Sequence, residues 1–97
     1  MTSVLKTAQA GTLESNDIMI TVAPASEDQP VTIALQSLVM AQYGDMIRET
    51  ITATLAKQGV ASVHVQAVDR GALDCTIQAR LLTALERAGV ALKEAEQ

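Results

Sequence analysis

Apolar and polar residues repeat along the chain with two different periods, and each period predicts its own kind of element. Strict alternation is typical of half-buried strands, whereas apolar residues three or four positions apart indicate an amphipathic helix. The segments that alternate are residues 18–23, 31–36 and 62–67, and residues 7–13 are a weaker candidate for a strand. The segments with a helical period are residues 38–58 and 72–88.

Glycines mark where the predicted helices begin and end. Gly44 interrupts the first helical segment, so we expect its regular part to begin at Asp45, a residue type that caps helix N-termini. Gly59 and Gly89 follow the two segments directly and are suited to end them, because glycine readily adopts the left-handed conformation.

Each predicted helix has one apolar face. In the first helix, the residues of this face are Met40, Tyr43, Ile47, Ile51, Thr54 and Leu55. In the second helix, they are Ile77, Leu81, Ala84, Leu85 and Ala88, beside a polar stripe of Thr76, Arg80, Thr83 and Arg87. We expect Ile47, Ile51, Ile77 and Leu81 to lie between the helices and a sheet.

The order of these elements, β-β-β-α-β-α, predicts an α+β fold. Two amphipathic helices must both cover an apolar surface, which favours a two-layer sandwich with a four-stranded mixed sheet covered on one face. The strand–helix–strand unit over residues 31–68 is long enough for a parallel crossover. The strand order stays open. The ends, residues 1–6 and 90–97, are expected to fray.

Composition favours one globular domain over residues 1–97. The chain is 48% hydrophobic, and its only aromatic residue is Tyr43, so the core must consist of aliphatic side chains. Binding of single-stranded nucleic acid is disfavoured, because it usually requires aromatic stacking.

Charge argues against the same partners and against membranes. The net charge is −4, and the seven basic residues are scattered, which disfavours both nucleic acid and anionic membrane surfaces. No apolar run reaches membrane-spanning length, and residues 1–10 lack the layout of a secretory signal. The single Cys75 cannot form an internal disulfide. These features predict a cytoplasmic protein.

Residues that could perform catalysis are scarce. His64 and Cys75 are each the only residue of their type, too few for a structural zinc site, and we expect neither a metal site nor a catalytic residue. His64 is expected on the polar face of its strand. Cys75, in the first turn of the second helix, is either a reactive thiol or, as we expect, a small partly buried residue. Asp69 and Asp74 are expected to form a turn and a helix start.

Ser15 lies in the predicted turn between the first two strands. Its neighbours Glu14, Asn16 and Asp17 all favour turns, and Asn16 tolerates the left-handed conformation of tight hairpins. We therefore expect Ser15 to be exposed near the tip of a hairpin. Spacing alone makes it an ordinary turn residue, and two acidic neighbours would repel a phosphorylated substrate.

Three ordered segments resemble the citrate lyase acyl carrier protein (γ subunit) family. The segment from Ala10 to Asp17, AGTLESND, matches the family's modification site. Residues 43–48, Tyr-Gly-Asp followed by Ile and Arg, match its middle, and residues 71–81, GALDC followed by ARL, match its C-terminal signature. The resemblance covers nearly the whole chain. The family's carriers are not four-helix bundles like those of fatty-acid synthesis.

The resemblance implies a cofactor and partners. Ser15 would carry 2'-(5''-phosphoribosyl)-3'-dephospho-coenzyme A through a phosphodiester bond, added by a prosthetic-group transferase. The arm's thiol would carry acetyl and citryl groups between the acyl-transferring α subunit and the citryl-cleaving β subunit, so that citrate yields acetate and oxaloacetate. The chain itself would be a non-catalytic carrier. Carriers of citramalate lyase or malonate decarboxylase remain alternatives, as does a structural or regulatory interaction module without any arm.

Overall fold

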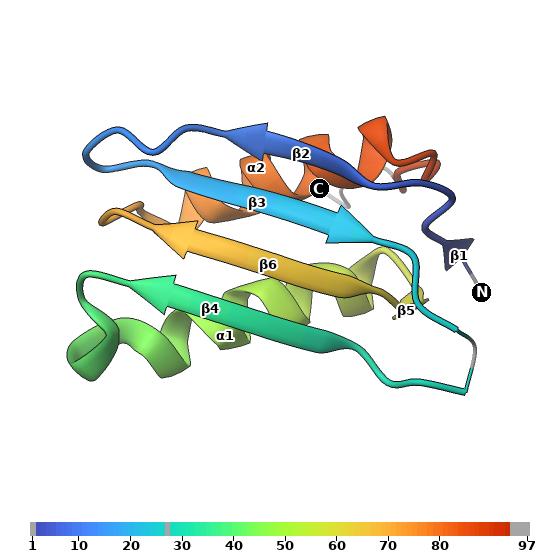
Figure 1. The fold of residues 1–97 in the computed structure, drawn as a ribbon, viewed down its shortest axis with the longest axis horizontal. Helices are drawn as coiled ribbons and strands as arrows, with labels where there is room; N and C mark the ends of the chain where they lie inside the picture. The colour runs from blue at the N-terminus through green and yellow to red at the C-terminus, as the bar shows by residue number, and fades with distance from the viewer. Residues whose placement is uncertain (1, 27, 94–97) are drawn as a thin grey trace.

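The computed structural model describes residues 2–26 and 28–93. In it, two helices lie side by side on one face of a four-stranded sheet, while the other face of that sheet is open (Figure 1). The α+β two-layer architecture predicted from the sequence is confirmed, and no helical bundle is formed.

The elements follow the predicted order, with two short strands added. The strands are β1 (Thr2–Ser3), β2 (Ala8–Gly11), β3 (Ile18–Ala23), β4 (Thr32–Ser37), β5 (Val60–Ser62) and β6 (His64–Asp69). The helices are α1 (Met40–Lys57) and α2 (Asp74–Arg87).

The main sheet has the order β2-β3-β6-β4, which the sequence had left open. β2 pairs antiparallel with β3, and β3 pairs antiparallel with β6. β4 and β6 are parallel, as the crossover predicted, with Ile33 opposite Val65 and Leu35 opposite Ala67. This arrangement brings three connections to one end of the sheet: the β2–β3 loop, the β4–α1 loop and the β6–α2 loop (Figure 1).

The aliphatic core fills the space between the sheet and the helices. It is lined from the sheet by alternate residues of β3 and β6, such as Ile20 and Val65, which are at most 2% exposed. The four helix residues expected there, Ile47, Ile51, Ile77 and Leu81, are all buried. The helical phases predicted from the sequence are therefore confirmed for both helices.

The start of α1 differs from the prediction. The helix begins at Met40 and runs through Gly44, so the expected start at Asp45 is wrong. The Met40 side chain lies over Gly44, where an added Cβ would come within 2.8 Å of its sulfur. Gly44 thus allows close packing within the first turns. Because these turns extend beyond the core, Met40 and Tyr43 are exposed, although their spacing placed them on the apolar face.

The two ends of the chain also differ from the prediction. β1 pairs in parallel with β5, forming a small second sheet. Val4 and Val90 are buried, and the amide of Leu5 donates a hydrogen bond to the carbonyl of Ala88 at 3.0 Å. Fraying is therefore wrong for these residues, which complete the core at the C-terminal end of α2; residues 1 and 94–97 lie outside the described residues. Neither helix in the described part of the chain is long and apolar enough to cross a bilayer.

Candidate functional site

Ser15 is exposed in the loop that joins β2 to β3. The amide of Asp17 donates a hydrogen bond to the carbonyl of Glu14 at 3.2 Å, which closes a turn with Ser15 and Asn16 at its centre. Asn16 has φ = 65°, the left-handed conformation that asparagine tolerates better than most residues. The predicted hairpin with an exposed serine at its tip is confirmed.

Asp17 fixes this loop to helix α2. Its carboxylate accepts two hydrogen bonds from the guanidinium of Arg80, at 3.0 and 2.8 Å, and one from the hydroxyl of Thr12 at 2.7 Å. The Arg80 bonds, followed by the Thr12 bond, lower the pKa of Asp17 to about 2, although burial opposes this shift. Because its charge is paired, Asp17 does not present the free negative charge that we expected beside Ser15. Glu14 remains exposed.

The tip loop is also joined to the turn that follows β6. The amide of Asn16 donates to the carbonyl of Arg70, and the amide of Arg70 donates to the carbonyl of Asp17, both at 2.8 Å. These two bonds extend the β3–β6 ladder past the ends of both strands. Asn16, the residue that follows Ser15, is therefore fixed to a second loop. The tip of the hairpin is held in place as a platform for Ser15.

Arg70 brings a positive charge to this platform. Its side chain is exposed, and it forms no side-chain hydrogen bond or ion pair with any residue in 2–26 or 28–93. Its backbone is hydrogen-bonded to Asn16 and Asp17, so the residue that carries this charge lies beside the segment that follows Ser15. Sequence reasoning treated Arg70 only as part of a turn.

Asp69 organises the β6–α2 loop from inside. It is 1% exposed, and its carboxylate accepts hydrogen bonds from the Ser37 hydroxyl at 2.8 Å and from the amides of Gly71 and Ala72 at 3.1 and 3.0 Å. An aspartate that bonds the amides two and three residues onward is a common turn-forming motif, so the predicted turn is confirmed. Its bond to Ser37, which ties this loop to the end of β4, was not foreseen.

A groove opens at the same end of the molecule, between the first half of α1 and the β6–α2 loop. Its volume is about 600 Å³. The lining residues are Val39, Tyr43, Met46, Ile47, Asp69, Gly71, Ala72, Leu73, Asp74 and Cys75. Cys75 is exposed at this groove, so the expectation that it is partly buried is wrong.

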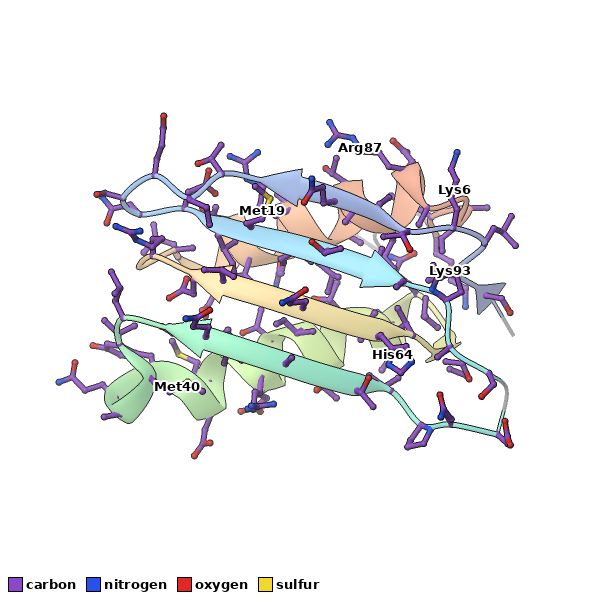
Figure 2. The ribbon with its side chains drawn as sticks, in the orientation of Figure 1. Lys6, Met19, Met40, His64, Arg87 and Lys93 are labelled. Carbon is purple, nitrogen blue, oxygen red and sulfur yellow. The ribbon has the colours of Figure 1, made fainter. Side chains whose placement is uncertain are left out.

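His64 lies away from this end. It is exposed on the open face of the sheet, at the start of β6, and its Nδ1 shares a hydrogen bond with the Thr32 hydroxyl (Figure 2). Its position on the exposed face of the strand is the one predicted from the sequence. Figure 2 shows Met40, near the start of α1, at the opposite end from His64. Among residues 2–26 and 28–93, no three His, Cys, Asp or Glu side chains are close enough together to bind a metal ion.

Comparison with known proteins places this geometry in a family. A family model described as the malonate decarboxylase delta subunit (MdcD), with the short name ACP, matches residues 5–88. The citrate lyase acyl carrier protein of Streptococcus uberis is 56% identical over 85 residues, which are 88% of this chain and 82% of that protein. The citrate lyase acyl carrier protein of Streptococcus mutans is 53% identical over the same shares.

A solved structure shares the fold. The crystal structure of a Pseudomonas malonate decarboxylase hetero-tetramer in complex with malonate contains a chain that superposes with a TM-score of 0.75. The two chains are 20% identical, and the match covers 90% of this chain and 88% of the other. The fold and the matched model define a small α+β acyl carrier protein. Within that class, the identities of 53% and 56% show that the chain belongs to the citrate lyase acyl carrier protein family.

Proposed function

We propose that this chain is the acyl carrier subunit of a citrate lyase complex and that Ser15 is the attachment point of its prosthetic arm. Acyl carrier proteins of this family carry a prosthetic group on a serine and are non-catalytic subunits. The observation that carries the proposal for Ser15 is its exposure at a tip held by both the Asp17–Arg80 pair and the Asn16–Arg70 bonds.

The residues around Ser15 suit a group joined through a phosphodiester. The serine hydroxyl is accessible for bond formation. Arg70, whose side chain pairs with no residue in 2–26 or 28–93, lies on the adjoining turn, where its cation can attract the phosphate of the incoming group. Pairing of Asp17 with Arg80 leaves Glu14 as the exposed acid next to Ser15. We propose that the group is the 2'-(5''-phosphoribosyl)-3'-dephospho-coenzyme A implied by the resemblance.

The arm supplies a thiol, on which an acyl group travels as a thioester. The contribution of this chain is positional. A fixed tip keeps the point of attachment outside the fold, while covalent attachment raises the effective concentration of the acyl group at the partners' active sites. We propose that those partners are the α and β subunits of the lyase and that a transferase loads the arm.

Citrate is the substrate that the comparisons favour. The relatives that are more than half identical are citrate lyase carriers, whereas the malonate decarboxylase chain is 20% identical and supports only the fold. Citramalate lyase and malonate decarboxylase are therefore less well supported. Membership of a carrier family also disfavours the remaining alternative, a structural or regulatory interaction module without any arm.

Acetyl loading tests the function. We expect the wild-type chain, isolated from cells that also produce the catalytic subunits and the transferase, to take up one thioester-linked acetyl group and to support citrate cleavage in the reconstituted complex. Cys75→Ser should do the same, because the functional thiol belongs to the arm. Ser15→Ala should do neither. Acetyl uptake by Ser15→Ala, or its loss in Cys75→Ser, would place the functional thiol elsewhere.

A further inference from the structure

The groove at the Ser15 end has the size and surface of a ligand site. Its volume of about 600 Å³ is within the range of small-molecule pockets, roughly 300–1,000 Å³. Three of its lining side chains, Tyr43, Met46 and Leu73, are large, apolar and 46%, 42% and 71% exposed. Large apolar side chains that are exposed next to one another usually mark a surface where a ligand or a partner binds.

The groove begins beside the proposed attachment point. Gly71 lines it, and the side-chain oxygen of Asn16 lies 3.6 Å from the position that a Cβ on Gly71 would occupy. Ser15 precedes Asn16 directly. A flexible group attached to Ser15 therefore starts at the rim of the groove and needs no rearrangement of the fold to enter it.

The lining of the groove suits a neutral occupant. Its ionisable carboxylates are those of Asp69 and Asp74, and among residues 2–26 and 28–93 no lysine or arginine lines it, although the exposed Arg70 lies between the lining residues Asp69 and Gly71. The oxygens of Asp69 are already occupied by Ser37, Gly71 and Ala72. What remains is a mainly apolar surface with the carboxylate of Asp74 at its edge, which suits a neutral group.

We propose that this groove is the resting site for the end of the arm on Ser15, holding it as the neutral thiol or acetyl thioester. This inference rests on the proposed function. Tethering makes a weak site sufficient: at an effective concentration of about 1 mM, a site with a Kd of about 1 mM is already half occupied. A neutral thioester held there would be shielded from water by the apolar lining.

Tyr43 provides a direct readout, because it is the only aromatic residue and it lines the groove. Intact mass first establishes that the arm is present. We then expect the ring signals of Tyr43 in the NMR spectrum to differ between the acetyl-loaded chain and the arm-free Ser15→Ala chain. Unchanged ring signals in a chain whose mass proves loading would overturn the resting site while leaving the carrier function intact.

Alkylation of the arm's thiol by iodoacetamide gives a second measurement. Every chain should also carry Cys75→Ser, because Cys75 is exposed at the groove and would react. Because a groove that is at least half occupied protects the thiol for at least half of the time, Met46→Gln/Leu73→Gln should raise the alkylation rate by about twofold or more. The matched control is Leu5→Gln, since Leu5 is 72% exposed but lies against Gly89, at the other end of α2.

The two measurements distinguish a resting site for the arm from a docking surface for a partner. Faster alkylation in the groove variant, with the Leu5→Gln rate unchanged, supports the resting site. Equal rates in all three chains would overturn it, as would Tyr43 signals that change only when a partner subunit is added, because the groove would then be a docking surface. A chain without added mass would overturn the attachment at Ser15 and the resting site together.

Discussion

Replacement of Asp17 by asparagine tests whether the Asp17–Arg80 pair holds the tip of the hairpin. The substitution keeps the shape of the side chain but removes its charge. It also replaces one carboxylate oxygen, an acceptor, by an NH2 group, a donor. That donor faces groups that donate to the carboxylate in the wild type. Those donors are Arg80 at 2.8 and 3.0 Å, Thr12 at 2.7 Å and the amide of Ile18 at 2.7 Å. At least one of them must lose its partner.

The size of the effect follows from the pKa of Asp17. A pKa lowered from 3.8 to about 2 corresponds to roughly 2.5 kcal/mol of interaction with the ionised form. The Arg80 side chain is 40% exposed, so solvent screens part of this interaction, and we expect a loss of about 1–2 kcal/mol. For a domain of this size, that loss lowers Tm by roughly 5–15 °C.

The stability difference between wild type and Asp17→Asn should depend on pH. Because the folded-state pKa of Asp17 is depressed, its contribution to stability is full above the unfolded-state value of 3.8 and is lost as pH falls through about 2. Thermal unfolding followed by far-ultraviolet circular dichroism should show a large Tm difference between wild type and Asp17→Asn at pH 6. That difference should shrink between about pH 4 and pH 2.

Two further variants decide whether the pair is responsible. Glu14→Gln removes a negative charge from the same loop, and because Glu14 is exposed it should change stability by less than about 0.5 kcal/mol. In a double-mutant cycle, Asp17→Asn and Arg80→Gln should together cost less than the sum of the two single losses. Additive losses, or a Tm difference that does not vary with pH, would refute the role given to the pair.

Three other substitutions test the core, the hairpin and the thiol. Ile51→Ala should lower the free energy of unfolding by roughly 2–5 kcal/mol in urea titration, because Ile51 is fully buried; a loss below about 1 kcal/mol would contradict its place in the core. Gly11→Ala should cost more than about 1 kcal/mol in the same assay, since Gly11 has φ = 102° and its Cβ would lie 1.8 Å from the carbonyl oxygen of Ile18; an unchanged stability would refute this geometry. Cys75→Ser should change stability by less than about 0.5 kcal/mol, because the thiol is exposed, and a larger loss would show that the thiol is packed.

The local pattern was sufficient to predict most of the fold. Alternation in β3 and β6 reflects a sheet with one buried face, so residues such as Ile20 and Val65 could be assigned to the core from sequence. The helical period did the same for Ile51 and Leu81. It failed at Tyr43 because periodicity reports which side of a helix a residue occupies, and α1 extends beyond the sheet at that end.

The contacts that shape the site were not predictable from local pattern. The sequence pattern places Arg80 in the polar stripe of α2 but does not indicate which group it contacts. Its partner Asp17 is 63 residues away, and the residues around Asp17 indicate only an ordinary turn. The β1–β5 pairing and the burial of Val90 also depend on segments that only the folded chain brings together. The exposure of Ser15 was predictable because it follows from the turn itself. The groove beside it requires the relative positions of α1 and the β6–α2 loop.

Attachment of the arm to Ser15 is tested most directly by intact mass spectrometry of the chain made together with its transferase and catalytic subunits. We predict a wild-type mass increased by one coenzyme A-derived group, far more than one phosphate, and fragmentation that assigns the added mass to Ser15. Ser15→Ala from the same cells should have the mass of the bare chain. An arm on Ser15→Ala, or an arm assigned to another residue of the wild type, would contradict the account.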